Sequence, residues 1–166
     1  RVAILVSDTS VLIDLERGSL LEALFQLPYQ FAVPDLLYER ELVGPFGETL
    51  KSLGLVVEEL TPDEVSRATL VRRERATLSA PDTFAFALAE ARTWALLTGD
   101  GELRNLATAE GVEFHGVLWL IDQFEAEATI AVEDLHTALT AISSHPRCRL
   151  PKAEIKKRLN RLAPGG

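Results

Sequence analysis

Residues 2–14 read VAILVSDTSVLID, and this stretch decides the fold. Its first five residues are all apolar, which is the length and pattern of a short strand buried on both faces. Thr9 or Ser10 can cap the helix that follows, because apolar residues recur at helical spacing from Val11 onward. The stretch therefore predicts a buried strand and then a helix, with Asp8 at the junction between them.

The same alternation of short apolar segments and helical patterns continues along the chain. Because short strands that are apolar on both faces and separated by helices form parallel sheets, the predicted fold class is α/β, with a central parallel sheet covered by helices on both sides. The first helix is expected to continue to Leu24, and Gly44-Pro45-Phe46-Gly47 is expected to end a later one. The predicted strands after the first are 31–33, 55–60, 94–98 and 112–114, and the later helices are 36–43, one starting at 61–64, 83–92, 101–109, 117–125, 132–142 and 152–162.

Charge is unevenly distributed along this chain of 166 residues and net charge −8. Residues 143–166 hold seven Lys and Arg residues against one acid, Glu154, which makes this segment +6 and the remainder −14. We therefore expect a main domain at residues 1–142 and a basic helical tail at residues 143–166. No apolar run approaches the roughly 20 residues that span a bilayer, so no membrane partner is expected. The single cysteine, Cys148, excludes an intrachain disulfide and fits a cytoplasmic location.

Four acids fall where a parallel sheet would gather them. Asp8 and Asp100 each follow a predicted strand by two residues, Glu39 lies about one turn into the helix after the second strand, and Asp82 lies in the first turn of a later helix. Ligands of such sheets bind beyond the carboxyl ends of the strands, so Asp8, Asp100 and Glu39 are expected to line one cleft, and Asp82 can join them if its helix starts at the same edge.

The helical positions of two neighbouring glutamates favour one of them for this cleft. With Asp35 at zero and about 100° per residue, Glu39 falls near 40°, in the middle of the apolar face that includes Leu42. Glu41 falls near −120°, on the opposite side, and is expected to be a solvated helix acid. A carboxylate on an inward face is costly unless something pairs with it.

Carboxylates that converge are expected to bind a cation. Two carboxylates about 4 Å apart repel by roughly 4 kcal/mol at an effective dielectric near 20, so a group of them is partly protonated or holds a metal ion. Oxygen ligands select Mg²⁺ or Mn²⁺, and carboxylate-held Mg²⁺ activates water against phosphodiesters. Each acid also has a structural alternative: Asp8 as a helix cap, Asp82 in a capping box with Ser79, Asp100 as a turn residue, and Glu39 paired with Arg72 or Arg73.

The stretches around these acids resemble the PIN-domain nucleases. The matching pieces are VSDTSVLID (6–14), VPDLLYE (33–39), APDTFAFALA (80–89) and LLTGDGELR (96–104), and their order and spacing agree over about residues 2–125. The resemblance implies a three-layer α/β/α sandwich. It also implies Mg²⁺- or Mn²⁺-dependent cleavage of RNA in the cytoplasm, with catalytic and metal-binding residues at Asp8, Glu39, Asp82 and Asp100.

Further residues and partners remain open within this resemblance. Ser10 and Thr98 would be polar helpers, Glu102 is either a fifth ligand or a surface acid, and the family's glutamate aligns with Glu39 or Glu41. Basic residues could bind RNA phosphates, or could be solvated residues on packed helices; they are Arg72, Arg73, Lys156 and Lys157.

Many bacterial members of this family are VapC-type toxins held inactive by an antitoxin, and members often dimerise. The resemblance therefore favours the toxin of a type II toxin–antitoxin pair, with a cognate antitoxin and a second copy of the chain as partners. The alternatives are a PIN-like nuclease without an antitoxin and a catalytically weak module that binds RNA or protein.

Overall fold

A five-stranded sheet forms the centre of the molecule, and all of its strands are parallel in the order β3-β2-β1-β4-β5. The computed structural model describes residues 3–164, so the predicted start of the first strand at Val2 lies outside the described residues. The strands are β1 (Ala3–Ser7), β2 (Tyr29–Pro34), β3 (Val56–Glu58), β4 (Ala95–Leu97) and β5 (Phe114–His115). This arrangement confirms the predicted α/β fold with a central parallel sheet.

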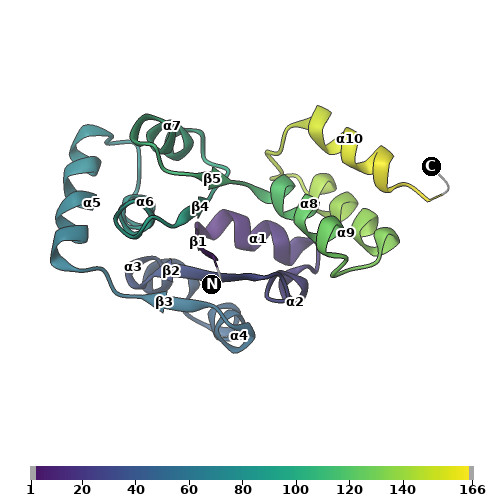
Figure 1. The fold of residues 1–166 in the computed structure, drawn as a ribbon, viewed down its shortest axis with the longest axis horizontal. Helices are drawn as coiled ribbons and strands as arrows, with labels where there is room; N and C mark the ends of the chain where they lie inside the picture. The colour runs from purple at the N-terminus through teal and green to yellow at the C-terminus, as the bar shows by residue number, and fades with distance from the viewer. Residues whose placement is uncertain (1–2, 165–166) are drawn as a thin grey trace.

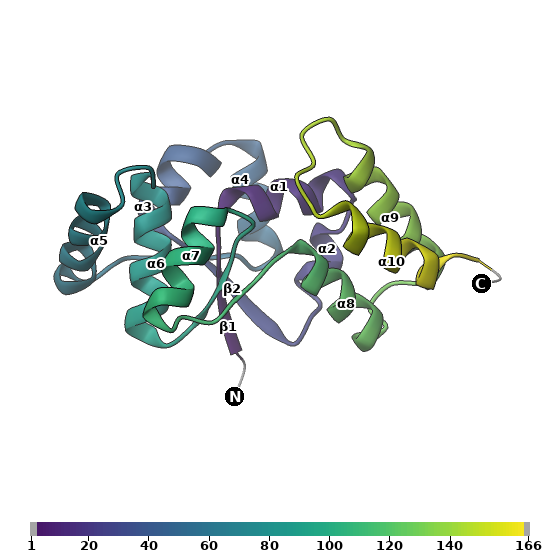
Figure 2. The same cartoon turned by 90° about the horizontal axis from the view of Figure 1, so that it is seen from above.

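Helices cover both faces of the sheet (Figures 1 and 2). Helices α5 to α7 lie on one side and α8 to α10 on the other, with α1 beside the latter group in Figure 1. The helices are α1 (Thr9–Arg17), α2 (Leu21–Leu24), α3 (Asp35–Leu37), α4 (Pro45–Leu53), α5 (Pro62–Glu74), α6 (Ala80–Arg92), α7 (Gly101–Glu110), α8 (Val117–Glu127), α9 (Val132–Ser144) and α10 (Lys152–Leu162), and a π-helical turn, η1 (Tyr38–Leu42), follows α3.

The alternation of side chains along β1 and β4 divides the core into two layers. Leu5 and Leu97 belong to one cluster with α1, α8, α9 and α10, whereas Val6 and Leu96 belong to the other with α5, α6 and α7. Successive residues of a strand point to opposite faces, so a strand covered on both sides must be apolar at every position. The apolar run at the start of the sequence is therefore buried from both sides, in a three-layer α/β/α sandwich.

Two local expectations are wrong, and a third segment does more than was predicted. The first predicted helix does not continue to Leu24, because Gly18 ends α1 and Ser19 adopts a positive φ of 57° before α2 begins. The segment Gly44–Gly47 follows the end of the preceding helical turn at Leu42, as predicted, and it also starts α4, since Pro45 occupies the first turn, where its missing N–H is not needed. Gly47 lets α4 approach η1 closely: a Cβ there would lie 2.1 Å from the carbonyl oxygen of Leu42.

The second correction concerns the helix predicted at 36–43. It forms as the short helix α3 followed by the wider turn of η1, whose hydrogen bonds join residues five apart, as from the Val43 N–H to the Tyr38 carbonyl oxygen at 3.0 Å. This change of winding alters which residues of the segment face the predicted cleft at the carboxyl ends of the strands.

The basic tail ends in a helix that is docked on the body. Ile155 and Leu162 of α10 are buried in the cluster that contains α1, and Arg158 pairs with Asp122 of α8 at 2.8 Å. Arg161 pairs with Asp122 at 3.0 Å and with Glu125 at 2.7 Å. The packed-helix reading of this segment is therefore confirmed for α10. None of the helices formed by residues 3–164 has the length and apolar character to cross a membrane.

Candidate active site

Asp8 lies at the carboxyl end of the central strand β1 and is 5% exposed. Its carboxylate caps α1, since Oδ1 accepts a hydrogen bond from the Val11 N–H at 2.9 Å. Thr98 Oγ1 donates to the other oxygen, Oδ2, at 2.5 Å. The helix cap is therefore Asp8, and neither Thr9 nor Ser10, which were predicted to cap this helix.

The environment of Asp8 opposes its charge. Burial raises the pKa of Asp8 to about 6, although its hydrogen bonds with Thr98 and Val11 lower the pKa. The negative charges of Asp82 and Asp100 raise the pKa further, because both carboxylates lie close enough to repel it. Three of the four predicted acids therefore converge at the carboxyl ends of β1 and β4.

Thr98 links the ends of the two strands. Its side chain is fully buried, and Oγ1 accepts a hydrogen bond from the Asp100 N–H at 3.0 Å while it donates to Asp8. Asp100 in turn caps α7, because Oδ2 accepts from the Leu103 N–H at 2.8 Å. The predicted polar helper Thr98 thus holds one site carboxylate and the backbone of a second.

Asp82 is a helix-capping residue that also faces the other acids. It forms the predicted capping box of α6 with Ser79, with hydrogen bonds of 3.3 and 3.2 Å. Burial raises the pKa of Asp82, and the negative charges of Asp100 and Glu41 raise it further. The structural and the functional readings of Asp82 are thus compatible, since its carboxylate can cap a helix and still lie beside Asp100.

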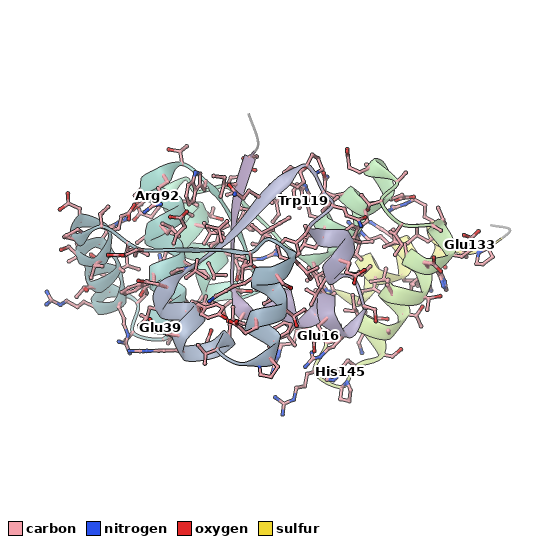
Figure 3. The ribbon with its side chains drawn as sticks, turned by 90° about the horizontal axis from the view of Figure 1, so that it is seen from below. Glu16, Glu39, Arg92, Trp119, Glu133 and His145 are labelled. Atoms are coloured by element: carbon pink, nitrogen blue, oxygen red, sulfur yellow. The ribbon has the colours of Figure 1, made fainter. Side chains whose placement is uncertain are left out.

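Glu41, not Glu39, is the glutamate that the structure brings to these acids. Thr9, next to Asp8, donates from Oγ1 to Glu41 Oε1 at 2.6 Å, and the charge of Glu41 acts on Asp82. Glu39 is exposed, so the prediction that it occupies the middle of an inward face is wrong; Glu41 is exposed as predicted, and its contact with Thr9 is what links it to the site. Figure 3 shows Glu39 at the edge of the molecule. The physical reason is the π-helical turn η1, in which the α-helical step of about 100° per residue does not apply.

The remaining predicted residues lie around the edge of this site. Ser10 is exposed and lines a groove together with Asp100. Glu102, in the first turn of α7, is exposed and pairs with Arg75 at 3.4 Å. Its position matches the surface-acid alternative.

The predicted basic contacts differ in their surroundings. Arg72 and Arg73 are exposed near the end of α5 and line a cavity of about 280 Å³ with Thr83 and Phe84 of α6, the helix that carries Asp82. On α10, Lys157 pairs with Glu154 at 3.2 Å, and Lys156 is exposed. The proposed arginine partners of Glu39 form no ion pair with it in the part of the chain that the structure describes.

The donor set fits a hard divalent cation. It consists of carboxylate oxygens with one threonine hydroxyl beside them, the ligand types that suit Mg²⁺ and Mn²⁺. Each oxygen of Asp8 accepts one hydrogen bond and keeps a second acceptor site for a cation. As the side chains stand, no three His, Cys, Asp or Glu residues within 3–164 are gathered around a single point in the manner of a formed metal cage.

The comparison with protein families agrees with this arrangement. A family model described as "PIN domain" matches residues 4–164, which is nearly the whole chain and includes α10. The chain therefore belongs to a family of PIN domains. Membership of this family indicates a nuclease, and PIN domains typically use divalent metals. A search of curated proteins finds no match to this chain.

Proposed function

We propose that this protein is a metal-dependent endoribonuclease that hydrolyses RNA phosphodiester bonds at the site of Asp8, Asp82, Asp100 and Glu41. The observation that carries the proposal is the convergence of carboxylates on a buried Asp8, whose pKa is raised to about 6 by burial and by its acidic neighbours. Such an arrangement destabilises the fold on its own. A divalent cation would offset this repulsion, so a catalytic use explains why the helix-capping residues that converge here are charged carboxylates, although uncharged caps such as Ser or Asn would serve folding alone.

The residues of the site have separable tasks in this proposal. Asp8, Asp82 and Asp100 would hold the cation, with Glu41 beside Asp82. When bound, the cation supplies Lewis-acid chemistry, polarising the phosphate and lowering the pKa of water. Thr98 and the Val11 N–H fix the carboxylate of Asp8 in one orientation by their two hydrogen bonds.

The helix starts at this site add to the recognition of a phosphate. Helices α1, α6 and α7 all begin beside the acids, with Asp8 and Asp100 as caps and Asp82 in a first turn. A helix N-terminus carries a partial positive charge and unpaired N–H groups, both of which favour anions. The substrate phosphate would therefore meet favourable backbone dipoles next to the acids that bind the cation.

The test is cleavage of a structured RNA in Mg²⁺ by the wild type and by Asp8→Asn. Asparagine retains a side-chain oxygen that can cap α1, and circular dichroism confirms that the fold is unchanged. A matched control is Asp35→Asn, because Asp35 also follows a parallel strand, and within residues 3–164 its side chain accepts a hydrogen bond from the adjacent Leu36 N–H alone, at 2.8 Å. We expect the loss of cleavage in Asp8→Asn alone; equal cleavage by all three proteins would contradict the proposal.

We further propose that the biological role is that of the toxin in a type II toxin–antitoxin pair. The support is the resemblance of the motif sequences to VapC-type toxins, and the partners would be a cognate antitoxin and a second copy of the chain. A small neighbouring reading frame whose product suppresses RNA cleavage when the two are co-expressed is the expected result. If the product of the adjacent gene leaves cleavage unchanged, the antitoxin part of the proposal fails, while the ribonuclease part stands.

A further inference from the structure

A groove of about 560 Å³ lies beside the acid site, between three segments that are distant in sequence. One wall comes from α1 and includes Ser10 and Arg17, and the base includes the turn around Asp100. The other wall is the connection between α9 and α10, at Arg147, Arg149 and Leu150. The volume is within the range of about 300–1,000 Å³ that is typical of small-ligand pockets. The groove therefore joins the acid site to the start of the basic tail.

The connection between α9 and α10 carries two exposed arginines on a backbone that is held by hydrogen bonds to His145. Its residues alternate, since Arg147 and Arg149 are exposed whereas Cys148 and Leu150 are half-buried and contact the core. The backbone is held by His145, whose Nδ1 accepts from the Arg147 N–H at 3.1 Å and whose carbonyl oxygen accepts from the Cys148 N–H at 3.0 Å. Figure 3 places His145 on the same edge of the molecule as Glu39. Residues 145–148 thus form a turn, and the alternation that follows leaves both arginines exposed to solvent along the groove that Asp100 also lines.

The lining of the groove has a net charge of +1, because Asp14 and Asp100 offset two of its three arginines. Arg17 pairs with Asp14 at 3.4 Å, so this pair adds no net charge. Arg147 and Arg149 make no ion pair with any residue in the range 3–164, unlike Arg158 and Arg161 further along the same tail. Unpaired guanidinium groups beside an acid site are suited to anions, because their planar N–H donors match two phosphate oxygens.

The backbone beside Asp100 is open to a ligand of this kind. A Cβ added at Gly99 or Gly101 would meet no atom of another segment within 4 Å, so no other part of residues 3–164 covers this turn. Glycine at such positions allows a ligand to approach the main chain closely. A strand that occupies the groove would therefore touch the turn that carries Asp100 and, on the far wall, the two arginines.

We propose that Arg147 and Arg149 bind backbone phosphates of the RNA strand that is cut, next to the bond that lies at the acid site. This inference rests on the proposed ribonuclease function and names how its substrate is held. RNA is favoured over an acidic peptide because the groove is continuous with Asp100, so its occupant also contacts the site that would cut a phosphodiester. The arginines are positioning residues, and the main part of the tail, α10, serves to anchor the connection that carries them.

The test compares Arg147→Ala/Arg149→Ala with a control that removes the same charge from the same tail, Lys152→Ala/Lys156→Ala. Both lysines are exposed on α10 and neither lines the groove. Binding of a short fluorescent single-stranded RNA is measured in EDTA over a series of salt concentrations. Each phosphate contact contributes about 0.7 to the slope of log affinity against log salt for single strands, so losing two contacts lowers the slope by about 1.4. The control pair should keep the wild-type slope.

Cleavage in Mg²⁺ provides a second readout that a merely structural role would not give. The variant Arg147→Ala/Arg149→Ala is expected to have a higher KM than the wild type and an unchanged kcat. The variant Arg147→Lys/Arg149→Lys should recover part of the lost affinity. A salt slope that is the same in Arg147→Ala/Arg149→Ala as in the wild type would overturn the groove assignment, even if the wild type cleaves RNA. If the wild type does not cleave RNA but the salt slope of Arg147→Ala/Arg149→Ala falls as expected, the proposed ribonuclease function is wrong and the proposed RNA-binding groove stands. Tighter binding of a polyglutamate peptide than of RNA would also overturn the inference.

Discussion

Replacing Asp8 with asparagine should stabilise the metal-free protein while it removes activity. The carboxylate of Asp8 is buried and lies close to Asp82 and Asp100, so at neutral pH the fold must hold an unfavourable charge. Asparagine has almost the same shape and can still cap α1, but it carries no charge. A residue whose removal strengthens the fold and abolishes function is present for function.

The size of this effect follows from the pKa of Asp8. A rise from 3.8 to about 6 is roughly two units, and each unit corresponds to about 1.4 kcal/mol, so the charge destabilises the fold by about 3 kcal/mol at pH 7. Asparagine weakens the hydrogen bond from Thr98, which offsets about 1 kcal/mol of this gain. The expected net stabilisation is about 1–2 kcal/mol.

The pH dependence gives the sign of the effect. Because the pKa of Asp8 is higher in the folded state, folding favours its protonated form, and the wild type loses stability as pH rises from about 3.8 to about 6. Asparagine does not titrate in this pH range. The gain in stability of Asp8→Asn over the wild type should therefore be absent below about pH 3.8 and complete above about pH 6.

The assay is urea unfolding in EDTA at pH 4 and at pH 7, with Asp35→Asn as the matched control. Added Mg²⁺ should stabilise the wild type more than Asp8→Asn and so narrow the difference between them. An asparagine variant that is less stable than the wild type at pH 7, or a difference that does not change with pH, would refute the reasoning.

Three further predictions concern single residues. Glu41→Gln should lower kcat/KM for RNA cleavage by more than Glu39→Gln does, because Glu41 is the one of the two that is hydrogen-bonded at the site. A larger loss in Glu39→Gln would show that the sequence analysis was right to favour Glu39. Thr98→Val should destabilise the fold by about 1–3 kcal/mol in urea unfolding, since it removes the partner of Asp8 Oδ2 and of the Asp100 N–H. An unchanged midpoint would count against that bridge. Arg92→Ala should destabilise the fold by about 2–3 kcal/mol, because it leaves the buried Glu64 carboxylate unpaired. The double variant Arg92→Ala/Glu64→Gln should recover part of this loss. If it recovers none, the effect is due to packing and not to charge.

The parts of the fold that periodicity controls could be predicted from the sequence. A short apolar strand requires cover on both faces, so the segments predicted as strands at residues 2–6 and 94–98 indicated a parallel sheet before any contact was known. Parallel strands also place their carboxyl ends at one edge, which is why Asp8 and Asp100 were expected together. Asp82 joined them because α6 begins at the same edge.

The parts that depend on local winding and on tertiary contacts could not be predicted in this way. The choice between Glu39 and Glu41 depended on regular α-helical spacing, which the π-helical turn η1 breaks. The groove arginines were noted only as members of a basic tail, although Arg147 and Arg149 alternate with the half-buried Cys148 and Leu150. That alternation is visible in the sequence, but its proximity to Asp100 is set by how α9 and α10 dock.

The most direct test of the central claim is the rate of RNA cleavage measured against Mg²⁺ concentration for the wild type, Asp8→Asn and Asp35→Asn. We predict a saturable Mg²⁺ dependence in the wild type and in Asp35→Asn, complete loss of cleavage in EDTA, and a reduction of about 100-fold or more for Asp8→Asn at every Mg²⁺ concentration. Cleavage that persists in EDTA, or that is equal in the wild type and Asp8→Asn, would contradict the assignment of the carboxylate cluster as a metal-dependent active site.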